Sequence, residues 1–152
     1  MQNNSGACQD ITIAWYADDF TGAAATMEVL TFSGIPSILF LEMPSEKQLK
    51  RFPHVRGIGI ASTARTQSPV WMKDHLPAIF SGLNNLAPDL VHYKVCSTLD
   101  SSPTVGSIGC AIDVAAEYFG VQSVPVMIAA PKMHRYQCFG HLFAGVNDDV
   151  MR

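Results

Sequence analysis

The chain has 152 residues, of which 48% are hydrophobic and 15% are charged, and its formal net charge is −3. That length fits one domain with a sizeable core, and the composition argues against disorder. The slightly acidic balance, without runs of Lys or Arg, argues against a nucleic-acid partner. The polar N-terminus and the lack of a long apolar run argue against a membrane partner, and four widely spaced cysteines favour free thiols in the cytoplasm over a zinc site.

Short apolar segments alternate with helical stretches along the chain. The expected strands are 11–16, 37–41, 57–61, 90–95 and 124–130, and the expected helices are 21–33, 46–52, 69–83 and 103–119. Several strand segments are apolar almost throughout, which is typical of strands buried on both faces. The pattern predicts a single α/β domain built on an open, mostly parallel, doubly wound sheet with helices on both faces. A further strand at 138–144 and a turn at 145–149 are expected near the end.

Two adjacent aspartates, Asp18 and Asp19, stand between the first strand and the first helix. One of them has an ordinary use as a helix N-cap, because free backbone N–H groups there favour a carboxylate. The other adds a like charge, which is tolerable mainly when a cation, a metal or a hydroxyl-rich ligand uses the acceptor capacity. The pair is therefore either a cap beside a solvated acid or the acidic part of a binding site.

Polar residues after the other strands are further candidates, because ligands of parallel α/β sheets bind beyond the carboxyl ends of the strands. Arg65 follows the third strand, where its planar fork could hold a carboxylate, although a lone loop arginine is more often solvated. Lys94 lies inside the fourth strand, and its ammonium needs a partner that Asp18 or Asp19 could supply. The hydroxyl-rich turn that follows could hold a polyol or a carboxylate, or it could be a plain turn with Ser102 as N-cap of a helix opened by Pro103.

Signatures of nucleotide binding are absent. Gly57-Ile58-Gly59 lacks the third glycine of a dinucleotide fingerprint, and there is no Gly-x-x-x-x-Gly-Lys phosphate loop. A phosphatase with an aspartyl nucleophile would need a second acid two residues after the first, where this chain has Phe20 or Thr21. A magnesium-dependent phosphohydrolase that uses the two aspartates is therefore weakened but stays open.

Three segments resemble the four-carbon acid sugar kinase family: 17–23, 93–102 with 106–109, and 130–136. They read Ala-Asp-Asp-Phe-Thr-Gly-Ala, Tyr-Lys-Val-Cys-Ser-Thr-Leu-Asp-Ser-Ser with Gly-Ser-Ile-Gly, and Ala-Pro leading to Arg-Tyr. The second is most similar to the 3-oxo-tetronate kinases. The family phosphorylates tetronates and related short sugar acids with ATP, using an N-terminal domain for the sugar acid and a larger C-terminal domain for ATP. The resemblance implies a flexible N-terminus at 1–10 and a substrate-binding domain at 11–152, with the ATP-binding domain absent.

The resemblance also implies roles for individual residues. Asp19 would be the catalytic base, and Asp18 would contact substrate hydroxyls. The other substrate-binding residues would be Thr21, Gly22, Arg65, Lys94, Ser97, Thr98, Asp100, Ser101, Gly106, Gly109 and Arg135. ATP and magnesium would bind to the absent domain and no metal to this chain, which would be inactive without a nucleotide-binding domain or partner chain. A homodimer is a further expectation, and a stand-alone small-acid-binding or regulatory module is the alternative.

Overall fold

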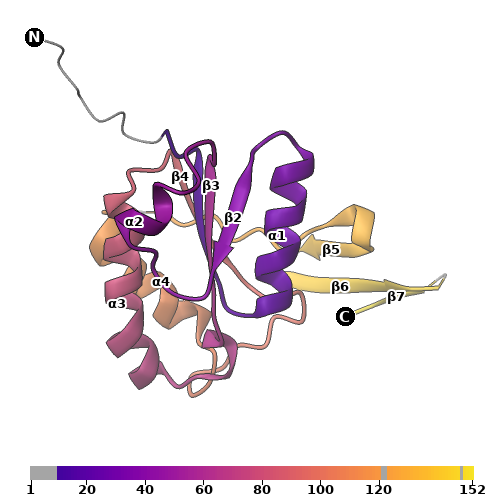
Figure 1. Ribbon diagram of the computed structural model, residues 1–152. Helices are drawn as coiled ribbons and strands as arrows, with labels where there is room; N and C mark the ends of the chain where they lie inside the picture. The colour runs from indigo at the N-terminus through magenta and orange to yellow at the C-terminus, as the bar shows by residue number, and fades with distance from the viewer. Residues whose placement is uncertain (1–9, 121–122, 148) are drawn as a thin grey trace, which may run out of the picture. The chain divides into compact units, whose positions relative to one another are not determined.

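The computed structural model describes residues 10–120, 123–147 and 149–152, which fall into two compact units that divide after Gly120. The flexible N-terminus expected at 1–10 lies almost wholly outside the described residues. The first unit contains a parallel sheet with the strand order β2-β3-β1-β4 (Figure 1). Its strands are β1 (Ile13–Ala17), β2 (Ser37–Phe40), β3 (Gly57–Ala61) and β4 (Leu90–Lys94).

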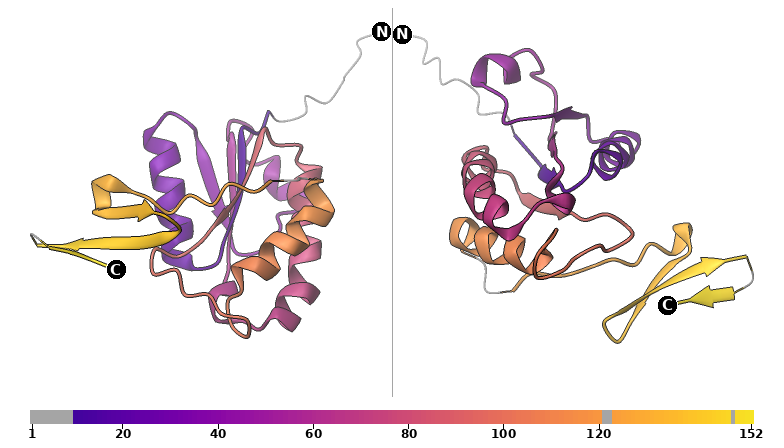
Figure 2. Two further views of the ribbon diagram at one scale, coloured as in Figure 1. Left: turned by 180° about the vertical axis from the view of Figure 1, so that it is seen from behind. Right: turned by 90° about the horizontal axis from the view of Figure 1, so that it is seen from below.

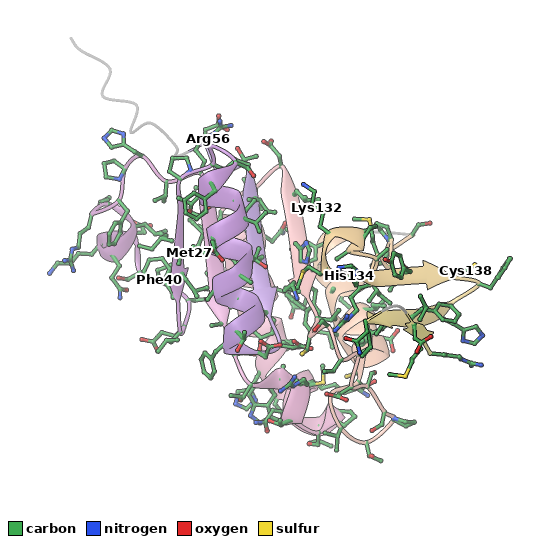
Figure 3. All side chains as sticks on the ribbon, turned by 90° about the vertical axis from the view of Figure 1, so that its right-hand side faces the viewer. Met27, Phe40, Arg56, Lys132, His134 and Cys138 are labelled. Carbon is green, nitrogen blue, oxygen red and sulfur yellow. The ribbon has the colours of Figure 1, made fainter. Side chains whose placement is uncertain are left out.

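Helices pack on both faces of this sheet (Figure 2), so the α/β prediction is confirmed. α1 (Phe20–Phe32) covers one face, where its Met27, labelled in Figure 3, packs against a small core around Trp15. α3 (Pro69–Asn85) and α4 (Ile108–Phe119) pack together on the other face, over a larger core that includes Tyr16 and Phe80. α2 (Glu46–Leu49) is a single turn between β2 and β3.

The central strand β1 positions the candidate site. All five of its residues are buried, because it has a strand on each side and a helical layer on each face. Its last residue, Ala17, pairs with Ala61 of β3 and with Lys94 of β4, so three strands end at one edge. The chain leaves β1 toward α1 on one face, whereas it leaves β3 and β4 toward helices on the other. That reversal is the topological switch point at which open α/β sheets bind ligands.

α4 begins later than the sequence predicts. The helix expected at 103–119 starts at Ile108, and its N-cap is Ser107 and not Ser102. The Ser102 hydroxyl instead accepts backbone N–H groups of the turn that follows it, at 2.9 and 3.2 Å. Gly106 then has a φ of +59°, which interrupts any right-handed helix. Pro103 therefore lies in a turn.

The second unit is a three-stranded antiparallel sheet in the order β5-β6-β7, preceded by a short 3₁₀ helix, η2 (Pro131–Met133). Its strands are β5 (Arg135–Cys138), β6 (His141–Val146) and β7 (Asp149–Met151). The single strand expected at 138–144 is wrong, because Phe139 and Gly140, with φ of +50° and +75°, form a tight turn inside it. The turn expected at 145–149 lies between β6 and β7, and residue 148 is outside the described residues.

The strand expected at 124–130 is also wrong. Its described residues have no strand conformation, and the isolated bridge at this segment joins Ala130 to Arg135. Pro125 cannot donate a hydrogen bond to a sheet, and an apolar run becomes a strand only where a neighbouring strand pairs with it. The parallel sheet therefore has four strands in the part of the chain that the structure describes.

Candidate functional site

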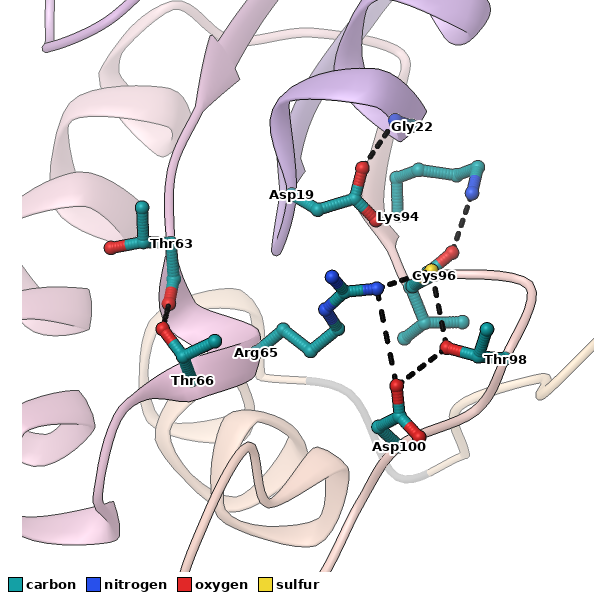
Figure 4. Close-up of polar contacts among 10 residues, drawn as sticks. Asp19, Gly22, Thr63, Arg65, Thr66, Lys94, Cys96, Thr98 and Asp100 are labelled. Atoms are coloured by element: carbon teal, nitrogen blue, oxygen red, sulfur yellow. Dashed lines mark hydrogen bonds and ion pairs between the residues drawn. The ribbon is translucent and has the colours of Figure 1, made fainter.

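Backbone hydrogen bonds fix the loops that leave the three central strands. The Asp18 N–H donates to the Lys94 carbonyl at 3.0 Å, and the Ser62 N–H donates to the Ala17 carbonyl at 3.1 Å. The Arg65 N–H donates to the Asp18 carbonyl at 3.1 Å. These bonds extend the strand ladders past their ends, so the polar side chains of the loops after β1, β3 and β4 are held at one edge of the sheet (Figure 4).

Asp18 is a buried acid with one oxygen left free. Its exposure is 4%, and Oδ1 has no hydrogen-bond partner among the described residues. The backbone N–H of Cys96 donates to the same carboxyl group. Burial, followed by the charge of Asp19, raises the pKa of Asp18 to about 6, against the opposing charges of Lys94 and Arg65. The free oxygen can accept a hydrogen bond from a ligand.

Asp19 is committed to the start of α1. It is the N-cap of that helix, and its Oδ1 accepts the Gly22 N–H. Partial burial acts to raise its pKa, but hydrogen bonds from Gly22 and the Cys96 thiol, with the charges of Arg65 and Lys94, lower it overall. A Cβ at Gly22 would lie 3.2 Å from both Asp19 Oδ1 and Lys94 Nζ, so the glycine leaves room for the two charged groups.

Arg65 lies in η1 (Ala64–Thr66), the 3₁₀ turn after β3. Its Nη1 lies 2.7 Å from the Cys96 Sγ and 3.9 Å from Asp100 Oδ2. Thr98 donates its hydroxyl to the same Asp100 oxygen at 2.7 Å and lies 3.3 Å from the same sulfur. Among the described residues no partner occupies Nε or Nη2 of Arg65, so this side of the fork is available to a carboxylate.

Cys96 is the site residue that the sequence reasoning missed. It contacts Arg65 and Asp19, whereas the sequence analysis includes it in the family motif and among the free thiols but gives it no role in the site. The signal that could have found it is its place inside the same motif as Lys94, Thr98 and Asp100.

Lys94 does not form the buried ion pair that the sequence suggests. Its ammonium donates to the Val95 carbonyl, and no ion pair within 4 Å joins it to Asp18 or Asp19 in the described unit 10–120. Its charge nevertheless acts on both aspartates, because it lowers the pKa of each. The lysine is therefore close enough to tune the acidic pair without neutralising either member directly.

Gly106 joins the hydroxyl-rich loop to the residues after β3. Its N–H donates to the Gln67 carbonyl at 2.8 Å, and a Cβ there would lie 2.3 Å from the Arg65 carbonyl oxygen. Its positive φ also favours glycine. Ser101 holds the other side of the loop by accepting the Ile108 N–H at 3.0 Å.

Two shallow hollows adjoin this loop. One, of about 390 Å³, is lined by Arg65, Asp100 and Ser101 among others. The other, of about 500 Å³, includes Ser101, Ser107 and Gly109 in its lining. Thr21, Ser97 and Thr98 are exposed.

Arg135 belongs to the second unit, where its Nη1 donates to the Met133 and His134 carbonyls at 3.2 Å. It therefore stabilises the turn around η2 locally, while the other predicted residues gather in the first unit.

Metal clusters and membrane spans are both missing from residues 10–120, 123–147 and 149–152. No group of three or more His, Cys, Asp or Glu side chains within these ranges is arranged to hold a metal ion. None of the helices described there is long and apolar enough to span a membrane.

A parallel α/β unit with a free buried carboxylate oxygen and an available arginine at its switch point defines the first unit as a small-molecule-binding domain. The family described as sugar-binding N-terminal domain matches residues 13–151, and the chain belongs to that family.

Two curated relatives support the same assignment. The chain is 45% identical over 137 residues, or 90% of its length, to a 3-oxo-isoapionate kinase from Paraburkholderia graminis. It is 29% identical over 134 residues, or 88% of its length, to a 3-oxo-tetronate kinase from Pectobacterium atrosepticum. The match covers 29% and 30% of those two proteins. The resemblance found in the sequence is confirmed, and the chain spans less than a third of either relative.

Proposed function

We propose that the chain is the sugar-acid-binding part of an ATP-dependent kinase that phosphorylates four-carbon acid sugars or closely similar acids. The relatives are named for 3-oxo-isoapionate and 3-oxo-tetronate, and threonate and erythronate have the same carboxylate and hydroxyl chemistry. The observation that carries the proposal is the buried free oxygen of Asp18 at the same strand edge as the available side of Arg65. One can accept a hydroxyl, and the other can bind a carboxylate.

Arg65 binds the substrate carboxylate in this proposal. A guanidinium matches a carboxylate with two parallel hydrogen bonds, and Nε and Nη2 lie on the side away from Cys96 and Asp100. Lys94 adds positive charge near the acidic pair. The aspartates and the hydroxyls of the 97–101 loop then contact the substrate hydroxyls, while Gly106 and Gly109 shape the backbone around them.

The nucleotide is assigned to a further part of the same polypeptide or to a partner chain. The relatives are named as kinases, and magnesium would accompany the ATP that a kinase uses. Phosphoryl transfer depends mainly on positioning and charge neutralisation. The contribution of this chain is to bind the sugar acid and orient its hydroxyl toward the phosphate.

Titration calorimetry on the 152-residue chain tests the proposal. We expect binding of 3-oxo-tetronate, 3-oxo-isoapionate, threonate or erythronate, and at least tenfold weaker binding of the matching neutral polyol, because Arg65 would lose its ionic partner. Arg65→Ala should remove this preference. Arg56→Ala is the matched control, because Arg56 is exposed and lies just before the first residue of β3, whereas Arg65 follows the last.

Equal binding of the acid and the neutral polyol would contradict the role of Arg65. If well-folded chain bound none of the four acids, the sugar-acid proposal itself would be wrong.

The two alternatives lead to different outcomes. A magnesium-dependent phosphohydrolase would cleave a model phosphate ester when magnesium is added. A stand-alone regulatory module would bind an acid but would show no phosphoryl transfer when the chain is joined to the remaining part of a relative such as the Paraburkholderia graminis kinase. No structural observation favours either alternative over the kinase domain.

A further inference from the structure

We propose that Asp18, and not Asp19, is the catalytic residue that takes the proton of the reacting hydroxyl, and that Asp19 is a positioning residue. This inference rests on the proposed kinase function and divides the roles within the same site. The resemblance alone favours Asp19, but the contacts of the two carboxylates point the other way.

Asp18 has a carboxylate oxygen that no described residue uses. Its Oδ1 is buried without a partner, although a buried carboxylate normally has its acceptors filled. Its charge adds to the effect of burial in raising the pKa of Tyr16, which belongs to the larger core, and of Tyr93, which packs against that core. A buried acceptor at the end of the central strand, without a partner among the described residues, is suited to a hydroxyl that arrives with the ligand.

Asp19, in contrast, already has hydrogen-bond partners on its carboxylate. Its carboxylate accepts the Gly22 N–H and the Cys96 thiol, and it faces the N-terminus of α1. These contacts stabilise the ionised form and lower its affinity for a proton. A base must gain a proton during the reaction, so these same contacts oppose that task. Asp19 instead holds the first turn of α1 and the Cys96 side chain, which in turn contacts Arg65.

The proposed reaction is transfer of the γ-phosphoryl group of ATP to the acceptor hydroxyl. The O–H bond of the acceptor hydroxyl breaks and its proton passes to Asp18 Oδ1. The hydroxyl oxygen forms a bond to the γ-phosphorus of ATP as the bond to the ADP oxygen breaks. The proton leaves Asp18 for solvent after the phosphorylated acid departs. Asp18 needs only to accept a hydrogen bond in the bound state and a proton in the transition state.

Two substitutions of Asp18 separate hydrogen bonding to the bound substrate from proton transfer in the reaction. Asp18→Asn can still hydrogen-bond the substrate hydroxyl, by donating from its NH2 while its oxygen accepts the Cys96 N–H, but it cannot take a proton. Asp18→Ala removes both hydrogen bonds. Asp19→Asn retains a good helix N-cap, because Asn and Asp cap helices equally well. Asp74→Asn makes the same chemical change at an exposed position of α3 and is the matched control.

Binding is measured by calorimetry on the 152-residue chain, with a four-carbon sugar acid and its monodeoxy analogues. Asp18→Ala should weaken binding of the sugar acid about tenfold to a hundredfold, and removal of one particular hydroxyl should abolish that difference. Asp18→Asn should bind within about threefold of wild type. The same hydroxyl should show no such coupling to Asp19→Ala.

Turnover is measured after this chain replaces the matched part of the Paraburkholderia graminis kinase. Asp18→Asn should lower kcat about a hundredfold or more with little change in KM, and Asp19→Asn should lower it far less. The inference is overturned if Asp19→Asn causes the larger loss of kcat, or if the hydroxyl couples to Asp19 and not to Asp18. Failure of the underlying kinase function is a different result, namely no binding of any sugar acid by the wild-type chain.

Discussion

Replacing Asp18 with Asn should make the domain more stable at neutral pH. Burial, assisted by the charge of Asp19, raises the pKa of Asp18 from 3.8 to about 6. The Asp18 carboxyl group therefore binds a proton more tightly in the native state than in the unfolded chain. The resulting stabilisation is fully present below pH 3.8 and is lost progressively as the pH rises through 6. At pH 7, which is above this pKa, the buried carboxyl group is mostly ionised.

The size of the effect follows from the shift. A gap of about two pKa units corresponds to about 3 kcal/mol between the fully protonated and fully ionised limits. The amide introduced by Asp18→Asn would still accept the Cys96 N–H and would carry no charge, so the variant would avoid this loss. We expect Asp18→Asn to exceed wild type by about 3 kcal/mol at pH 8 and by about 1 kcal/mol at pH 4.5.

Urea unfolding at several pH values, followed by the fluorescence of the fully buried Trp15, measures this difference. Asp74→Asn makes the same chemical change at an exposed position and is the matched control. A difference in unfolding free energy between Asp18→Asn and wild type that is constant with pH, or that shrinks as the pH rises, would contradict a raised pKa for Asp18.

Three further predictions concern the loop that carries the site. Gly106→Ala should lose about 2 to 3 kcal/mol in urea unfolding, because its Cβ would lie 2.3 Å from the Arg65 carbonyl, whereas Gly109→Ala, with its nearest atom at 3.9 Å, should be neutral or slightly stabilising. Ser107→Ala should lose about 1 kcal/mol, and Ser102→Ala less, since Ser107 is the N-cap of α4; equal losses in urea unfolding would contradict that assignment. Bound sugar acid should slow iodoacetamide labelling of Cys96 but not of the exposed Cys138, as followed by mass spectrometry of the peptides. If the ligand did not slow labelling of Cys96 more than labelling of Cys138, it would bind elsewhere.

The parallel sheet and its edge were accessible from sequence because their signals are local. Apolar runs and helix formers located β1 to β4 and α1 to α3 within a few residues. Since parallel strands end at one edge, the residues after them could be grouped from the sequence. The grouping of Asp18, Asp19, Arg65 and the 97–101 loop in one unit follows from that rule. The rule does not apply to Arg135, because this residue belongs to the second unit and the segment before it is not a strand of the parallel sheet.

The errors arose where long-range contacts decide the local conformation. Pro103 is a good first residue of a helix, but the turn that contains it is fixed by Gly106, whose backbone is bonded to Gln67 across the loop. Similarly, 124–130 has the composition of a strand, yet a strand exists only with a paired neighbour. Neither the Gln67 contact nor a missing neighbour can be read from the segment itself.

The same limit applies to the two aspartates, which the sequence presents as an equivalent pair. Asp18 follows the last residue of β1 and remains in the buried layer of the sheet, whereas Asp19 turns into the cap position of α1. Two consecutive residues therefore differ in environment: Asp18 has a buried carboxyl group with a raised pKa, and Asp19 has a hydrogen-bonded carboxylate with a lowered pKa. The stability that we expect Asp18→Asn to gain fits the proposal that this carboxylate is retained for the ligand and not for the fold.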